Sequence, residues 1–282
     1  MVNQKIDYSA LQNGIKLTDA EFRKLSSFIY KRYGVNIPPA KKTLLESRLQ
    51  KRLKALNLHS FKDYLTIVID KKENDEMVKM MDRVSTNKTD FFRESAHFDF
   101  MTNNVLANYQ NNLNIWCAAS SSGEEVYTLG ITIEEYLAKN NTNLKYSILG
   151  TDISTEMLNI GLLGIYNEER IAKIPLEIKR KYFLKSKEKS KSLVRVTKEL
   201  RSKVTFQRHN LIEHSYPSTA SYDIIFCRNV LIYFDKPTQE KIIMKLCNRL
   251  KKGGYFFLGH SESIIGINAP LQQLAHTTYQ KT

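Results

Sequence analysis

The first eighty-odd residues place their hydrophobic side chains at the spacing of α-helices. Thr18 and Glu21 stand three positions apart, the pattern of a capping box, directly before the first apolar run. Gly34 and the pair Pro38-Pro39 interrupt the pattern before a second helix. The apolar positions of the two helices are Phe22, Leu25 and Ile29, followed by Leu45, Leu49, Leu53 and Leu56. This spacing predicts an N-terminal helical domain over residues 1–85.

From about Asn112 the pattern changes to short apolar runs that alternate with helical segments. This alternation predicts an α/β fold with a doubly wound, Rossmann-like sheet over residues 86–282. The last helix is expected to stop at Gly253-Gly254, and the polar tail after Pro270 to form a final strand or to fray. The predicted strands are 114–118, 146–150, 204–206, 222–227 and 255–258, and the predicted helices are 125–137, 155–163 and 238–250.

One stretch departs from this alternation. Residues 178–203 contain eleven Lys and Arg residues against the acids Glu188 and Glu199. Within them, the run 193–196 (Leu-Val-Arg-Val) alternates apolar and polar positions as an edge strand does. We therefore expect a small β-subdomain to be inserted between the second and third strands of the main sheet.

The composition adds a strong positive charge. The 282 residues carry a net charge of +14, which is typical of proteins that bind nucleic acid or an anionic membrane and, less commonly, of proteins that bind an acidic protein surface. Part of this charge lies on the polar side of the second helix, which is either a solvated face or a docking surface for an acidic partner. Its basic residues are Lys41, Arg48, Lys51 and Arg52.

Targeting segments and metal motifs are not expected. No apolar run approaches eighteen residues, and the N-terminus lacks the apolar core of a secretory signal. The cysteines Cys117, Cys227 and Cys247 are odd in number and lack metal-ligand spacing. These features predict a cytoplasmic protein without membrane insertion and without a metal site.

Candidate ligand-binding residues follow four of the predicted strands. In an open α/β sheet, ligands bind at the carboxyl ends of the strands, near the point where the strand order reverses. Asp152 follows the second strand and suits ribose hydroxyls, although Asp is also a common helix cap. The turn 118–125 has only Gly123, so it is not a dinucleotide-binding motif, and a dehydrogenase is weakly supported. Asn210-Leu211 and Arg228-Asn229 end the third and fourth strands and suit an adenine slot or an ordinary turn.

A further polar segment precedes the sheet, at residues 86–94. Asn87 and Thr89 come before an aromatic pair, and Arg93 is placed to bind a carboxylate if the segment folds over the site. The alternative is a capped helix entry in which Arg93 faces solvent.

These segments resemble the CheR family, the glutamate methyltransferases of chemoreceptors. The resemblance extends from about Leu17 to about Tyr279. The segments that carry it are 85–94 (STNKTDFFRE), 118–125 ending in Ser-Gly-Glu-Glu, 150–153 (GTDI), Asn210-Leu211, 225–236 (IFCRNVLIYFDK) and 259–263 (GHSES). It implies an S-adenosylmethionine-dependent methyltransferase fold with an N-terminal all-helical domain and a small inserted antiparallel β-subdomain.

The resemblance also implies roles for individual residues. Arg93 and Tyr233 would border the transferred methyl group. The basic helix would face the cytoplasmic helical bundle of a chemoreceptor, and in some members the β-subdomain docks on a receptor C-terminal peptide; here its loop at 185–191 is lysine-rich and lacks glycine. S-adenosylmethionine would be contacted by Asn87, Thr89, Arg93, Glu125, Asp152, Asn210, Leu211, Arg228 and Asn229.

Two other functions remain as alternatives at this point. A nucleic-acid methyltransferase agrees with the charge, but the end of the fourth strand reads Arg228-Asn229-Val230 rather than an Asn-Pro-Pro-Tyr-like loop. A binding module that keeps the cofactor as a sensor ligand is the second alternative. Transfer of label from S-adenosylmethionine distinguishes them, because carboxyl methyl esters are base-labile and N-methyl groups are not.

Overall fold

The computed structural model describes residues 14–109, 112–188, 190–213, 216 and 221–282. The chain folds into two compact units, with the boundary between Thr86 and Asn87. Among the described residues, no helix is both long and apolar enough to span a bilayer.

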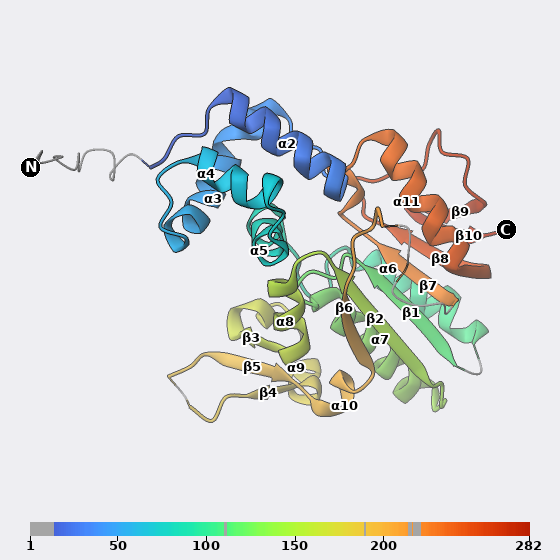
Figure 1. The fold of residues 1–282 in the computed structure, drawn as a ribbon. Helices are drawn as coiled ribbons and strands as arrows, with labels where there is room; N and C mark the ends of the chain where they lie inside the picture. The colour runs from blue at the N-terminus through green and yellow to red at the C-terminus, as the bar shows by residue number, and fades with distance from the viewer. Residues whose placement is uncertain (1–13, 110–111, 189, 214–215, 217–220) are drawn as a thin grey trace, which may run out of the picture. The chain divides into compact units, whose positions relative to one another are not determined.

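The first unit is helical, as the apolar spacing predicts (Figure 1). The predicted capping box is present, because the Thr18 hydroxyl accepts from the Glu21 amide and the Glu21 carboxylate accepts from the Thr18 amide. Leu45, Leu49 and Leu53 are buried as expected, and Leu56 follows the helix as its cap. The helices are α2 (Asp19–Tyr33), α3 (Lys42–Ala55), α4 (Phe61–Leu65) and α5 (Asn74–Val84), with short turns η1 (Pro39–Lys41) and η2 (Thr66–Asp70).

The second unit is built on a mixed sheet, which among the described residues has seven strands in the order β6-β2-β1-β7-β8-β10-β9. The first five strands in that order run parallel, and β10 and β9 are antiparallel additions at one edge. The strand order reverses between β1 and β7, which places the expected ligand crevice there. The strands are β1 (Leu113–Ala118), β2 (Tyr146–Asp152), β6 (Val204–Arg208), β7 (Tyr222–Cys227), β8 (Leu250–Leu258), β9 (Leu271–Ala275) and β10 (Thr278–Lys281).

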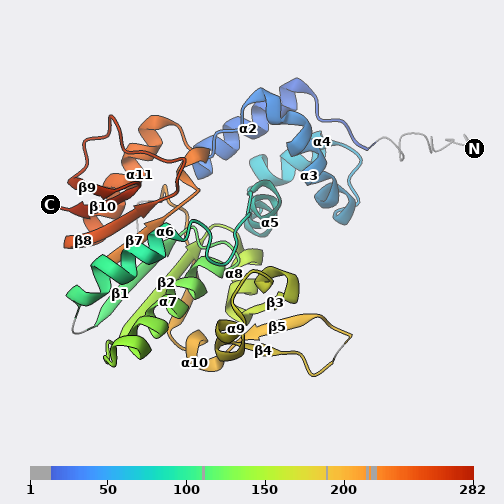
Figure 2. The same cartoon turned by 180° about the vertical axis from the view of Figure 1, so that it is seen from behind.

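Helices cover both faces of this sheet (Figures 1 and 2). One face shares a single hydrophobic core with α6 (Ala96–Phe100), η3 (Met101–Val105), η4 (Leu106–Asn108) and α7 (Glu124–Asn140). The sheet contributes alternate residues to that core, such as Ile115, Cys117 and Phe226. Helix α11 (Lys236–Arg249) packs against β8 and covers the other face. The doubly wound architecture predicted from the sequence is therefore confirmed.

The C-terminal part differs from the prediction at two points. Helix α11 ends at Arg249, and Gly253-Gly254 lie inside β8 rather than at the helix end. A Cβ atom at Gly254 would lie 2.8 Å from the carbonyl oxygen of Asp223, beside an irregularity in the pairing of β7 and β8. The glycine is thus needed for a close approach of two backbones within the sheet. The polar tail is ordered into β9 and β10.

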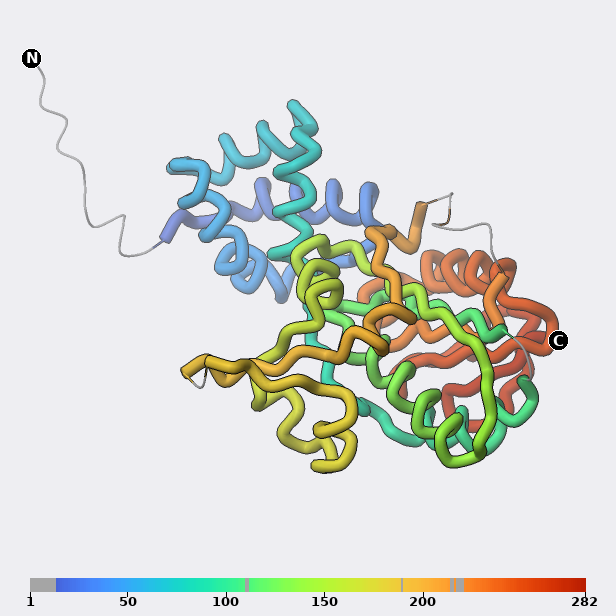
Figure 3. Tube along the Cα trace, turned by 90° about the horizontal axis from the view of Figure 1, so that it is seen from below, coloured from blue at the N-terminus to red at the C-terminus, as the bar shows by residue number. Residues whose placement is uncertain are grey.

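The predicted β excursion is also present. Within the described part of the chain, its strands pair antiparallel in the order β3-β5-β4. The sheet includes β3 (Ile165–Asn167), which precedes the expected start at residue 178, and η5 (Glu168–Ile171) follows that strand directly. Strands β4 (Phe183–Lys185) and β5 (Leu193–Val196) form a hairpin that projects from the unit (Figure 3). The connecting helices are α8 (Thr155–Leu163), α9 (Leu176–Tyr182) and α10 (Lys198–Arg201).

Candidate active site

The turn after β1 lies at the reversal of strand order and leads directly into α7. Gly123 is the N-cap of that helix and has a φ of 92°, a conformation that side-chain-bearing residues rarely adopt. A Cβ atom there would also lie 3.0 Å from Phe206 and 3.1 Å from the Cα of Gly161. The small residues of this turn therefore allow the backbone to pack closely, as the sequence indicated.

Asp152, at the end of β2, is fixed by backbone amides. Its Oδ2 accepts from the Ser121 amide at 2.8 Å, and its Oδ1 accepts from the Ser154 amide at 2.9 Å. Ser154 itself caps α8, so Asp152 is not the helix cap that the sequence left open. The side chain is 8% exposed and lies beside the turn after β1. This position suits a carboxylate that accepts hydrogen bonds from a bound ligand.

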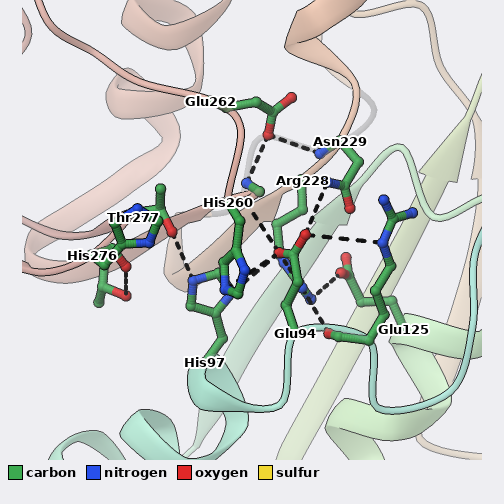
Figure 4. A network of polar contacts seen from close by, with 12 residues as sticks. Glu94, His97, Glu125, Arg228, Asn229, His260, Glu262, His276 and Thr277 are labelled. Carbon is green, nitrogen blue, oxygen red and sulfur yellow. Dashed lines mark hydrogen bonds and ion pairs between the residues drawn. The ribbon is translucent and has the colours of Figure 1, made fainter.

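The guanidinium of Arg228, at the end of β7, joins helix α7 to the segment before the sheet (Figure 4). Its Nη1 donates to Glu125 Oε2 at 2.7 Å, and its Nη2 donates to Glu94 Oε2 at 2.6 Å. The side chain of Arg228 is only 1% exposed. Burial raises the pKa of Glu94, but the hydrogen bond and charge of Arg228 outweigh it and hold that pKa below its ordinary value. In this ion-paired triad of Arg228, Glu94 and Glu125, Glu94 also has Arg93 nearby, whose Nε lies 3.9 Å from Glu94 Oε1.

Two arginines anchor the segment 86–94. Arg228 Nη2 also donates to the carbonyl oxygen of Arg93 at 2.7 Å. Arg170, from η5 beside the small sheet, donates to the carbonyl oxygen of Thr89 and pairs with the buried carboxylate of Glu124. The segment is therefore held on one side by the sheet end and on the other by the inserted β region.

A second buried carboxylate organises the end of β7. Glu262 is 6% exposed, and its two oxygens accept hydrogen bonds from four backbone amides at 2.7–2.8 Å. Burial raises the pKa of Glu262, and these four donors oppose that shift. The donors are the amides of Asn229, Val230, Leu231 and Gly259. The Glu262 carboxylate thus links the loop that follows β7 to the loop that follows β8.

Backbone strain is concentrated in the same loops. Non-glycine residues with positive φ cost on the order of 1–3 kcal/mol each and are common at functional sites. In this unit they include Phe92, Glu94, Ala119, Ser121 and Asn229, with φ between 48° and 80°. The segment 86–94 and the turns after β1 and β7 are therefore held in conformations that the surrounding contacts must maintain.

The predicted site residues are distributed over this framework. Asn87 joins it through its carbonyl oxygen, which accepts from the Ser121 hydroxyl at 3.0 Å. Asn229 donates from Nδ2 to Glu94 Oε1 at 3.1 Å. Asn210 and Leu211 are buried just after β6, where the amide of His209 donates to the carbonyl oxygen of Asp152. The ends of β1, β2, β6 and β7 thus meet, as expected.

Arg93 and Tyr233 are less enclosed than the rest. The Arg93 side chain is 34% exposed, and its Nη1 donates to the carbonyl oxygen of Lys88 at 2.9 Å. It is therefore neither fully solvent-facing nor buried in the ion-paired triad. Tyr233 is half-buried in η6 (Leu231–Tyr233), which follows the end of β7. Both residues are thus partly exposed beside the end of β7.

The family comparisons agree with this geometry. The chain matches the family model for the CheR methyltransferase, SAM binding domain, over residues 87–280. It matches the model for the CheR methyltransferase, all-alpha domain, over residues 20–85. The chain belongs to the CheR methyltransferase family. It is an S-adenosylmethionine-dependent methyltransferase, and the cofactor predicted from the sequence is confirmed at the level of the family.

Curated CheR relatives match along nearly their whole length. The chain is 38% identical to a chemotaxis protein methyltransferase from Borreliella burgdorferi, over 95% of this chain and 96% of that protein. It is 36% identical to one from Klebsiella aerogenes, over 95% and 91% of the two chains, and 32% identical to one from Escherichia coli, over 94% and 92%. The function in chemotaxis is thus shared by relatives that cover both units.

The residues present fit the cofactor of a CheR methyltransferase. Asp152 offers oxygens at the position where a ribose binds in such folds. The Ser120 hydroxyl, in the turn after β1, is 1% exposed and has no hydrogen-bond partner among the described residues. A buried hydroxyl without a partner is unfavourable unless a ligand or water satisfies it.

Three residues of this framework carried no predicted role. Glu94, Glu262 and His97 are important here because of contacts made with residues far away in the chain. Glu94 and Glu262 lie in segments that resemble the family, at 85–94 and 259–263, and this was the available signal. Burial is the main reason that the pKa of His97 falls to about 4, so His97 is neutral at pH 7.

Proposed function

We propose that this enzyme transfers the methyl group of S-adenosylmethionine to glutamate side chains on the cytoplasmic helices of chemoreceptors, giving methyl esters used in chemotactic adaptation. The observation that carries the proposal is the match to chemotaxis protein methyltransferases across both units. Such a substrate implies that the reaction takes place in the cytoplasm.

The proposed cofactor site uses the ends of the parallel strands. Asp152 would accept from the ribose hydroxyls, and Asn210 and Leu211 would border the adenine. Asn87, Thr89, Arg93 and Glu125 would surround the amino acid end of the cofactor. Arg228 and Asn229 would act there chiefly by position, because Arg228 is already bound to two carboxylates and Asn229 to one.

The proposed chemistry needs alignment more than acid–base catalysis. The cofactor supplies a methyl group that its sulfonium already activates. A glutamate side chain with an ordinary pKa near 4.3 is ionised at neutral pH and needs no general base. Arg93 would orient a carboxylate, that of the substrate or of the cofactor, and Tyr233 would line the methyl channel and donate a hydrogen bond. Alignment of this kind contributes a large part of the rate of transfer reactions.

The proposed docking surface is helix α3 together with Lys41, which ends η1 directly before it, and the four basic residues predicted to face the receptor differ in their contacts. Lys41 and Lys51 are exposed. Arg52 instead forms a bidentate ion pair with the buried carboxylate of Glu76, at 2.9 and 2.5 Å. Arg48 donates to the carbonyl oxygens of Val84 and Ser85. We therefore assign the encounter with an acidic receptor to the two lysines, and a structural role within the helical unit to the two arginines.

We also propose that the hairpin of β4 and β5 is a second docking element. The projecting hairpin of β4 and β5 has β4 at the edge of the small sheet, and Leu184 on that strand is 58% exposed. An edge strand of this kind accepts an extended peptide by strand addition. We propose a receptor C-terminal peptide as the added strand. A receptor fragment that lacks its C-terminus should then bind the enzyme more weakly than the complete fragment.

Methyl transfer to receptor fragments tests the proposed function directly. Purified enzyme is incubated with methyl-labelled S-adenosylmethionine and the cytoplasmic fragment of a receptor from the same cell. We expect label on the fragment that is released as methanol in mild base. A control fragment with its acceptor glutamates changed to alanine should take up no label. Base-stable label, or label only on added nucleic acid, contradicts the proposal.

A further inference from the structure

A group of metal-ligating side chains lies beside the ion-paired triad (Figure 4). Glu94 and His97 come from the segment before the sheet and from α6, and His260 follows β8. One potential ligand atom from each of the three residues lies within 4.8 Å of the other two. Glu94 Oε2 is 3.9 Å from His97 Nδ1 and 4.0 Å from His260 Nε2. One carboxylate oxygen and two imidazole nitrogens thus surround a common point.

The environment of His97 points to a ligand on its Nδ1. The ring is almost fully buried, and Nε2 lies 2.9 Å from the hydroxyl of Thr277. Nδ1 is buried and has no hydrogen-bond partner among the described residues. With the proton on Nε2, His97 donates to Thr277, and the lone pair of Nδ1 faces Glu94 and His260. Imidazoles that bind metals usually have their second nitrogen held by such a hydrogen bond.

The charges and freedom of movement around the cluster are also compatible with a cation. Arg93 and Arg228 balance the charges of Glu94 and Glu125, so an added cation is not placed in a net positive environment. His260 is the exposed member, with 47% of its side chain accessible. Two ligands at about 2.1 Å from a tetrahedral metal are about 3.4 Å apart. The separations of 3.9 and 4.0 Å at Glu94 therefore need to shorten by about 0.5 and 0.6 Å, through small movements of the Glu94 carboxylate and of the exposed His260 ring.

We propose that Glu94, His97 and His260 form a binding site for a divalent first-row transition metal such as Zn²⁺ or Co²⁺. Two imidazoles and a carboxylate favour these ions over Mg²⁺ and Ca²⁺, which prefer oxygen ligands. The remaining coordination position is left to solvent or to His276, whose ring centroid is 5.4 Å from that of His260. No sequence motif marks this site, because 166 positions in the chain separate His260 from Glu94.

Metal at this site inhibits methyl transfer. The ion shares Glu94 Oε2 with Arg228, so it weakens the contact that fixes the segment 86–94 to the end of β7. It also adds positive charge next to a site that binds a cationic cofactor. Binding of the metal does not depend on which substrate is methylated, so the site and the proposed function are tested separately.

Calorimetric titration of the purified, tag-free chain with Zn²⁺ tests the site. Absorption by bound Co²⁺ reports the coordination independently of activity. We expect one saturable site in the wild type, and His260→Gln should weaken binding by about tenfold or more. His59→Gln is the matched control, because His59 is exposed and lies in the helical unit. That variant should bind Zn²⁺ as the wild type does.

A second variant keeps the test decisive if His260 is only one of several exchangeable ligands. His97→Gln, checked for folding by circular dichroism, should also weaken Zn²⁺ binding and abolish the Co²⁺ bands. The proposal is overturned if the wild type shows no saturable binding. It is equally overturned if both variants bind Zn²⁺ with the wild-type affinity, since the metal would then lie elsewhere.

Discussion

Arg228 Nη2 lies 2.6 Å from Glu94 Oε2, although 134 residues separate them in the chain. Because the same guanidinium also holds Glu125 at 2.7 Å, one buried cation connects the segment before the sheet, helix α7 and the end of β7. The geometry of Arg93, next to Glu94, therefore depends on a residue that is itself almost fully enclosed.

Removal of Arg228 should destabilise the protein strongly. In Arg228→Met, the partly buried carboxylates of Glu94 and Glu125 lose their common partner, and we expect a loss of about 3–5 kcal/mol in the free energy of unfolding. Chemical denaturation measures this. The control Lys191→Met removes an exposed ion pair with Glu188 and should change stability by less than about 1 kcal/mol. Equal effects of the two variants would show that the triad is not a major source of stability.

Arg93 should matter for turnover rather than for folding. We expect Arg93→Ala to lower kcat by about a hundredfold, because the reacting carboxylate is no longer aligned. Initial rates of methyl transfer to a receptor fragment measure this, with a melting curve as a check on folding. Lys88→Ala is the control, since only the backbone carbonyl of Lys88 contacts Arg93. A variant at Arg93 with near-normal kcat would remove this residue from the mechanism.

His209 should make stability depend on pH. Burial is the main cause that lowers its pKa from 6.5 to about 4, with Lys245 and Arg208 adding to the effect. Between those two pH values the unfolded chain binds a proton that the folded chain excludes. The folded state therefore loses up to about 1.4 kcal/mol of stability for each unit that pH falls below 6.5, and no further loss arises below about 4.

Replacement of His209 tests this dependence. Denaturation of His209→Gln between pH 7 and pH 4 should show a shallower decline in stability than the wild type. His59→Gln, at an exposed position, should keep the wild-type slope. If both variants follow the wild type, the proton exclusion does not come from His209.

Charge on α3 should control the rate of encounter with the receptor. Lys51→Glu should slow methylation by about threefold or more at low salt, and the difference from the wild type should shrink as salt is added. Lys139→Glu makes the same charge change at an exposed position on α7 and should have little effect. Rates independent of salt in the wild type would indicate that α3 is only a solvated face.

Local patterns predicted most of the secondary structure. The capping box at Thr18 and Glu21, the buried run Tyr222–Cys227 and the helix Thr155–Leu163 are encoded within a few residues, and each forms as expected. Asp152 lies at the end of β2 as the sequence predicts, and its contact with a ribose stays a prediction.

Contacts between distant residues explain what the sequence did not predict. In the sequence, Glu262, Arg48 and Arg52 look like ordinary surface charges. Tertiary packing brings each of them to its partners, such as the four amides around Glu262. Gly253-Gly254 resembles a helix terminator, but the approach of the Asp223 carbonyl oxygen makes Gly254 part of a strand. In each case the residue type usually indicates a local feature, such as an exposed charge or a helix end, but here it makes a contact with a distant part of the chain.

Calorimetric titration with S-adenosylhomocysteine tests most directly whether the four strand ends form one cofactor site. We predict a single site in the wild type, and about tenfold weaker binding by Asp152→Asn, because a charged acceptor is lost. Lack of binding by the wild type, or equal affinity in the variant, would contradict the assembly of the site at these strand ends.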